Sequence, residues 1–132
     1  MSIDQPTTVA RKHRIFKSQI GPNDLYDLSK AIQRALCAET SNDRNWSEDE
    51  PHRGHSDVVA LIVQYAYGGT IECGRTNGVY HYWNRIDGYA IDLSGAPHNV
   101  GDEFVYCPNG ASNGLVHVVQ ERFDLLFDRI RI

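Results

Sequence analysis

The feature that most constrains this chain is an almost uniformly apolar run from Asp57 to Tyr67. A helix that is apolar nearly all round must be buried on all its faces. The β-branched residues in the run would also suit a strand, but its length and the Gly68-Gly69 stop after it favour a helix. The sequence therefore predicts a buried central helix of about three turns, which other elements must cover.

Other patterns predict the elements that cover this helix. Apolar residues from Leu25 to Leu36 recur at three- and four-residue steps after Gly21-Pro22, which predicts an amphipathic helix ending at about Ala38. Asn77-Gly78 and Asp87-Gly88 are turn dipeptides between runs of strand-like sequence. The expected strands are 70–73, 79–86 and 89–93, and a last helix is expected within 116–132. The predicted fold class is α+β: a central helix beginning at Ser56 packs on a small antiparallel sheet, with helices at both ends.

The length of 132 residues favours a single domain. Residues 1–20 are polar for most of their length and are expected to form a flexible arm, and residues 21–132 to form the domain. Residues 40–54 read as a long surface loop that leads the chain to Ser56.

Composition excludes several classes of function. A net charge of −4 argues against binding to nucleic acid, and the basic cluster at 11–14 reads as a solvated tail. No apolar run approaches the roughly 20 residues that span a bilayer. Three cysteines without a CxxC pair fit free thiols in a reducing compartment. The expected location is the cytoplasm, without membrane contact, and the oligomeric state stays open.

Three residues form a constellation that could carry chemistry: Ser56, His81 and Asp92. A nucleophile at a helix start is favoured by the partial positive charge there. Pairing across the Asp87-Gly88 turn would place Asp92 one diagonal step from the strand position opposite His81. If both side chains project to one face, Asp92 could orient the imidazole, and the other ring nitrogen could face Ser56.

The same residues carry a resemblance to a known family. The stretch His81-Tyr82-Trp83-Asn84-Arg85, the Gly-Gly pair before it and the Ile-Asp-Leu-Ser stretch at 91–94 resemble the YunG-like family. The resemblance implies a papain- or transglutaminase-like (Cys-His-Asp) fold, with His81 as base and Asp92 as the residue that orients it. The family pattern Gln-Cys-Ala reads His55-Ser56-Asp57 here, so serine replaces the nucleophilic cysteine.

This replacement favours the interpretation that the chain is a degenerate, non-catalytic member of the family. A thiol can be ionised by its histidine before it attacks, whereas a hydroxyl has a pKa many units higher. The additional free energy needed to ionise the hydroxyl is on the order of 10 kcal/mol. The family's glutamine is lost as a possible oxyanion donor, although His55 could donate instead. Asp57 is expected to disfavour an oxyanion. The predicted function is non-catalytic binding of a peptide, an amine or a protein in the old cleft, with no cofactor.

Three other interpretations stay open. Ser56 could act with His81 and Asp92 as a serine-dependent hydrolase or acyltransferase. Ser56 could instead be an ordinary helix N-cap. A third class is a metal-binding module, whose candidate ligands are His52, His55, His81, Asp92 and His98.

Overall fold

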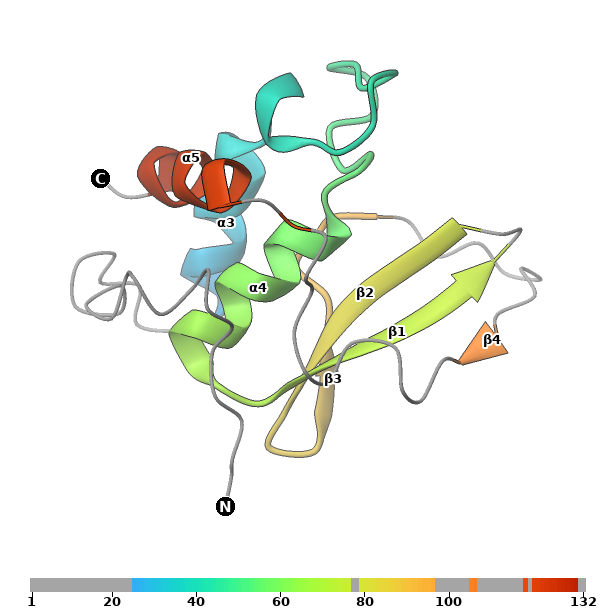
Figure 1. Ribbon diagram of the computed structural model, residues 1–132. Coiled ribbons are helices and arrows are strands. Elements are labelled where there is room, and N and C mark those ends of the chain that lie inside the picture. Colours follow the sequence, from blue (N-terminus) through green and yellow to red (C-terminus); the bar gives the residue numbers. More distant parts are fainter. Residues whose placement is uncertain (1–24, 77–78, 97–104, 107–117, 119, 131–132) are drawn as a thin grey trace.

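A computed structural model describes residues 25–76, 79–96, 105–106, 118 and 120–130. The elements are helix α3 (Leu25–Ala35), 3-10 helix η1 (Ala38–Thr40), helix α4 (Ser56–Tyr67), strands β1 (Thr70–Thr76), β2 (Val79–Ile86), β3 (Tyr89–Ile91) and β4 (Val105–Tyr106), and helix α5 (Gln120–Ile130). The α+β class is confirmed (Figure 1). The arm predicted for 1–20 and the turn predicted at Asn77-Gly78 lie outside the described residues.

Helix α4 is the buried centre that the apolar run predicted. Residues Val58 to Val63 are at most 1% exposed. The helix ends where expected, because Gly68 takes a positive φ of 79° and its amide donates to the Gln64 carbonyl. Gly69 also has φ 79°, and a Cβ there would lie 2.3 Å from the Arg85 carbonyl oxygen of β2. The Gly-Gly pair therefore ends the helix and lets β2 approach its end closely.

The strands form one antiparallel sheet in the order β3-β2-β1-β4. β1 extends three residues beyond the predicted end at Cys73, to Thr76. β3 ends at Ile91, short of the predicted Leu93, because the Asp92 carboxylate accepts the Ser94 amide and starts a turn. Strand β4 was not predicted, since its two residues are too few to show an alternating pattern.

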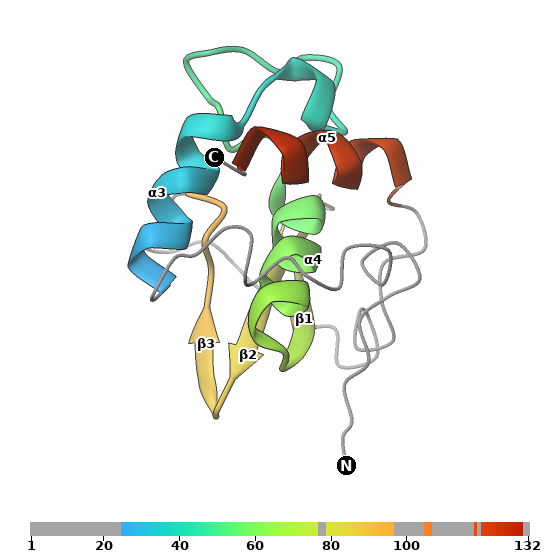
Figure 2. The same ribbon diagram turned by 90° about the vertical axis from the view of Figure 1, so that its left-hand side faces the viewer.

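Helix α4 lies between the sheet and helix α5, as the two views show (Figures 1 and 2). Helix α3 packs against α5. It ends at Ala35 and not at the predicted Ala38, because the Thr40 hydroxyl accepts the Cys37 amide and closes the short turn of η1. The common core contains Leu28, Ile32, Leu61, Ile62, Ile71, Phe123, Leu126 and Phe127, among others. In the part of the chain that the structure describes, no helix is both long and apolar enough to cross a membrane.

Candidate functional site

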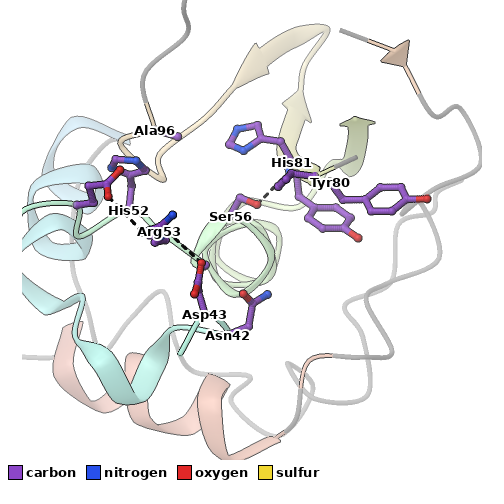
Figure 3. A pocket seen from close by; sticks show the side chains of 12 residues that line it. Asn42, Asp43, His52, Arg53, Ser56, Tyr80, His81 and Ala96 are labelled. Carbon is purple, nitrogen blue, oxygen red and sulfur yellow. Dashed lines mark hydrogen bonds and ion pairs between the residues drawn. The ribbon is translucent and has the colours of Figure 1, made fainter. Parts of the chain in front are cut away.

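A pocket of about 630 Å³ opens at the N-terminal end of α4, between the loop that precedes this helix and the start of β2 (Figure 3). The loop supplies one wall and the strand supplies the other. Its lining residues are Asn42, Asp43, Glu50, His52, Arg53, Gly54, Ser56, Val79, Tyr80, His81, Tyr82 and Ala96. Two of the three residues predicted to carry chemistry, Ser56 and His81, therefore face one cavity.

The third predicted residue, Asp92, binds the His81 ring directly. His81 Nε2 lies 2.6 Å from Asp92 Oδ2, and each side chain is 18% exposed. The structure thus places the two side chains within reach across the β2–β3 turn, as the register predicted. Burial raises the pKa of Asp92, but hydrogen bonds from His81 and the Ser94 amide outweigh it and leave this pKa below its ordinary value. Asp92 is therefore ionised at neutral pH and fixes the orientation of the imidazole.

A second contact fixes the plane of the His81 ring. The Trp83 ring stacks on it, with centroids 6.2 Å apart and planes 24° apart. Trp83 Nε1 donates to Glu72 on the neighbouring strand at 2.8 Å, and Glu72 also accepts Arg85 Nε at 2.9 Å. Trp83 is thus a packing residue whose packing partner is the site histidine.

Ser56 is the first residue of α4 and not its N-cap. The N-cap is His55, and the Val59 amide donates to its carbonyl. The Ser56 hydroxyl instead accepts the Tyr82 amide of β2 at 3.2 Å. Among the described residues, the hydrogen bond of this hydroxyl is to that amide and not to the His81 ring. The N-cap interpretation is therefore wrong, and the hydroxyl joins the helix start to the strand that carries His81.

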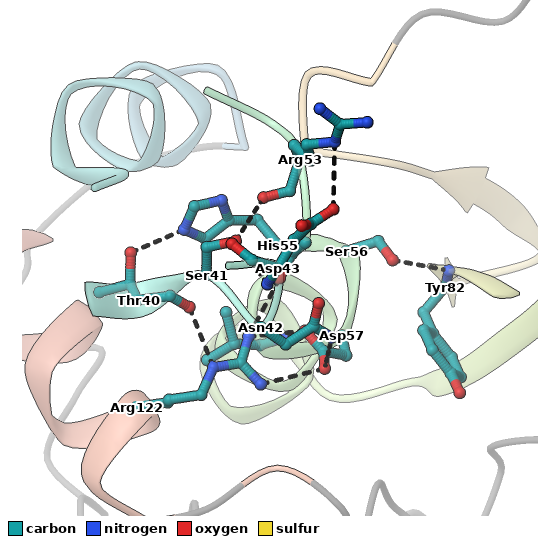
Figure 4. A network of polar contacts seen from close by, with 12 residues as sticks. Thr40, Ser41, Asn42, Asp43, Arg53, His55, Ser56, Asp57, Tyr82 and Arg122 are labelled. Atoms are coloured by element: carbon teal, nitrogen blue, oxygen red, sulfur yellow. Dashed lines mark hydrogen bonds and ion pairs between the residues drawn. The ribbon is translucent and has the colours of Figure 1, made fainter. Parts of the chain in front are cut away.

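Asp57, the residue after Ser56, is the centre of a buried ion pair (Figure 4). Its carboxylate is 1% exposed and accepts Arg122 Nη2 at 2.9 Å and Nη1 at 3.1 Å. Asn42 Nδ2 and the Val58 amide also donate to it. Burial raises the pKa of Asp57, but the hydrogen bonds and the charge of Arg122 outweigh burial, and the pKa lies below its ordinary value. The charge of Asp57 is thus compensated, which reduces the penalty on an oxyanion expected from the sequence.

His55 faces the core and not the pocket. It is 0% exposed, and its Nε2 lies 2.7 Å from the Thr40 hydroxyl. Burial is the main cause that lowers the pKa of His55 to about 4, and the Arg122 charge acts in the same direction. His55 is therefore neutral and structural, and the expectation that it could serve as an oxyanion donor is wrong.

The remaining pocket residues divide into two walls. Arg53 on the loop pairs with Asp43 at 3.1 Å and with Glu50 at 3.3 Å. On the opposite wall, Val79 is 66% exposed and Tyr80 is 51% exposed. A ligand would meet ion-paired groups on one side and apolar surface on the other.

The metal hypothesis gains no support from the geometry. Within the described ranges, no group of three or more His, Cys, Asp or Glu residues could hold a metal ion. His55 is directed at Thr40, and the candidate ligand His98 lies outside the described residues.

Arg122 matters at this site, and no sequence pattern predicted it. It lies 65 positions from Asp57 on an amphipathic helix, so no local spacing connects the two. The only available signal was the need of a buried carboxylate for a cationic partner.

Comparisons with known proteins agree with the resemblance. A family model described as "YunG protein" matches residues 24–131. The chain is 27% identical over 81 residues to "Uncharacterized protein YunG" of Bacillus subtilis (strain 168). The aligned segment covers 61% of this chain and 70% of that protein. No solved structure matches. The papain- or transglutaminase-like fold accordingly stays a prediction.

Proposed function

The chain belongs to the YunG family, and from that premise we propose that it binds a peptide in the pocket at the start of α4 without cleaving it. The papain- or transglutaminase-like fold is part of this proposal. It is supported by the order of the pieces along the chain: a residue at the start of a buried helix, then a histidine on a strand, then its aspartate. The observation that carries the proposal is the engagement of the Ser56 hydroxyl by the Tyr82 amide.

A serine nucleophile must lose its proton to a base as it attacks. In this pocket one lone pair of the Ser56 oxygen already accepts a main-chain hydrogen bond at 3.2 Å. A thiol paired with histidine can be ionised before attack, whereas a hydroxyl cannot, a difference on the order of 10 kcal/mol. Ser56 is therefore better suited to donating a hydrogen bond to a ligand than to attacking it.

The two walls of the pocket suit a peptide. A pocket of about 630 Å³ falls within the roughly 300–1,000 Å³ typical of ligand sites. Val79 and Tyr80 offer apolar surface to a side chain, and the Ser56 hydroxyl and the His81 ring offer polar atoms to a peptide backbone. A small anion alone would leave the apolar wall unused.

Nuclear magnetic resonance (NMR) with the ¹⁵N-labelled protein tests the proposal. Pools of capped tripeptides at millimolar concentration are expected to shift the amide signals of Ser56, Tyr80 and His81. Ala96→Trp, which fills the pocket, should abolish these shifts, while Leu125→Trp on the outer face of α5 should preserve them. The proposal fails if no pool shifts these signals, or if the filled pocket responds as the parent does.

A second candidate function is a serine-dependent hydrolase or acyltransferase. The His81–Asp92 contact at 2.6 Å favours it, because a base with its orienting carboxylate is retained. Since Asp92 occupies Nε2, the proton of Ser56 would pass to Nδ1.

A fluorophosphonate probe followed by mass spectrometry decides this second candidate. An active serine should give an adduct on Ser56 that disappears in His81→Ala. If no adduct forms across the pH range in which the protein is folded, the serine-enzyme hypothesis is excluded and the binding proposal is retained.

A further inference from the structure

We infer that Arg122 is a positioning residue of this pocket, which fixes the wall beside Ser56 and cancels the negative charge next to it. The inference deepens the proposed function, because it concerns the same site and its importance rests on that function. No residue of α5 lines the pocket among the described residues, so the effect of Arg122 is indirect.

The guanidinium of Arg122 joins three separate segments at the pocket wall. Its Nε donates to the Thr40 carbonyl at 3.0 Å, and Nη2 donates to the Gly54 carbonyl at 3.1 Å. Nη1 and Nη2 together hold the Asp57 carboxylate. These contacts bracket the loop 40–54 at both ends, and that loop supplies one wall of the pocket. A planar fork of five donors is suited to this task in a way that lysine is not.

The contacts extend to the residue directly before Ser56. The Thr40 carbonyl is held by Arg122, while the Thr40 hydroxyl is held by the buried His55 ring. Gly54, with φ +74°, leaves no room for a side chain, since a Cβ would lie 2.3 Å from Ser41 Oγ. The backbone that delivers Ser56 to the pocket is therefore fixed on both sides by this network.

Charge is the second contribution of Arg122. Asp57 and Arg122 form a buried neutral pair, with the side chains 1% and 12% exposed. Removing the cation would leave a carboxylate next to position 56, and removing the carboxylate would leave a cation. Because both side chains are shielded from water, either change should shift the pKa of an ionisable group at position 56.

A cysteine at position 56 reports the electrostatic effect of Asp57 and Arg122 without any ligand. In the Ser56→Cys background, iodoacetamide alkylation is measured against pH to obtain the pKa of the thiol. Arg122→Gln should slow alkylation below this pKa by about tenfold, and Asp57→Asn should speed it by about tenfold. The double replacement should return the rate close to the Ser56→Cys parent, because it removes both charges of the pair. The other charged and titratable side chains at the pocket, namely Asp43, Glu50, His52, Arg53 and His81 with its partner Asp92, are the same in every variant.

A residue with a merely structural role could not produce this order. Disruption of the pocket would change the rate in the same direction in all variants, and it would not make Asp57→Asn faster than the parent. Equal rates throughout, or an Asp57→Asn variant no faster than the parent, would overturn the inference. If Arg122→Gln does not fold, the comparison of Asp57→Asn with its parent still decides. A failure of peptide binding would leave this order of rates intact, so the two proposals can fail separately.

Discussion

Replacing Arg122 by methionine is expected to lower the free energy of unfolding by about 3–5 kcal/mol, a large part of the stability of a small domain. The replacement keeps most of the volume of the side chain and removes the guanidinium that neutralises the buried Asp57. It also leaves the Thr40 and Gly54 carbonyls without their Arg122 donor. Urea denaturation at pH 7, followed by circular dichroism, measures the change.

Arg129 on the same helix provides a matched control. It is exposed and donates a hydrogen bond to the Ala35 carbonyl, and it forms no ion pair with any residue of the described ranges. Arg129→Met is therefore expected to cost about 1 kcal/mol or less. In Asp57→Asn/Arg122→Met, where the uncompensated charge is also gone, part of the lost stability should return. The role given to the ion pair is wrong if Arg122→Met costs no more than Arg129→Met.

The sequence could predict the His81–Asp92 contact because both residues flank one short turn. A two-residue turn fixes the register of its strands, and the observed pairs run from Ile86–Tyr89 to Asn84–Ile91, where Ile91 directly precedes Asp92. The buried helix was predictable for a similar reason, since its apolar pattern and Gly-Gly stop are local. These features depend on residues close together in the chain.

The ion pair and the position of Ser56 could not be predicted in this way. Arg122 and Asp57 meet only after α5 has packed on α4, and in the sequence Arg122 resembles the other cations near the C-terminus. Serine at a helix start is typically an N-cap, but here the Tyr82 amide of β2 takes its hydroxyl. In both cases a tertiary contact overrides a local preference.

The start of α4 is a connected unit in which three consecutive side chains are each held by a different part of the chain. At the three positions 55–57, each side chain has its own partner. His55 binds Thr40, Ser56 binds the Tyr82 amide, and Asp57 binds Arg122. Introducing cysteine alone at position 56 would therefore leave its two neighbours in place, which is why the alkylation experiment varies the charge at Asp57 as well.

His55 should make the protein sensitive to mild acid. Its pKa is about 4 in the folded state, mainly because of burial, and 6.5 in the unfolded state. The unfolded state therefore binds more protons between these values, so the stabilising contribution is complete above pH 6.5 and is lost as the pH falls towards 4. The total loss is about 3 kcal/mol over this interval. Asp57 and Asp92, whose pKa values lie below 3.8, lose their contributions only at lower pH.

Urea denaturation at half-unit steps from pH 7 to pH 4.5 tests this window. In His55→Gln, whose amide can still bond to the Thr40 hydroxyl, the loss of stability with falling pH should be largely removed. His52→Gln, which removes a histidine from the pocket surface, should retain the loss. If the pH dependence persists unchanged in His55→Gln, the buried ring is not its source. If it disappears, the neutral form of the buried ring directly before Ser56 is what the full stability of the fold requires.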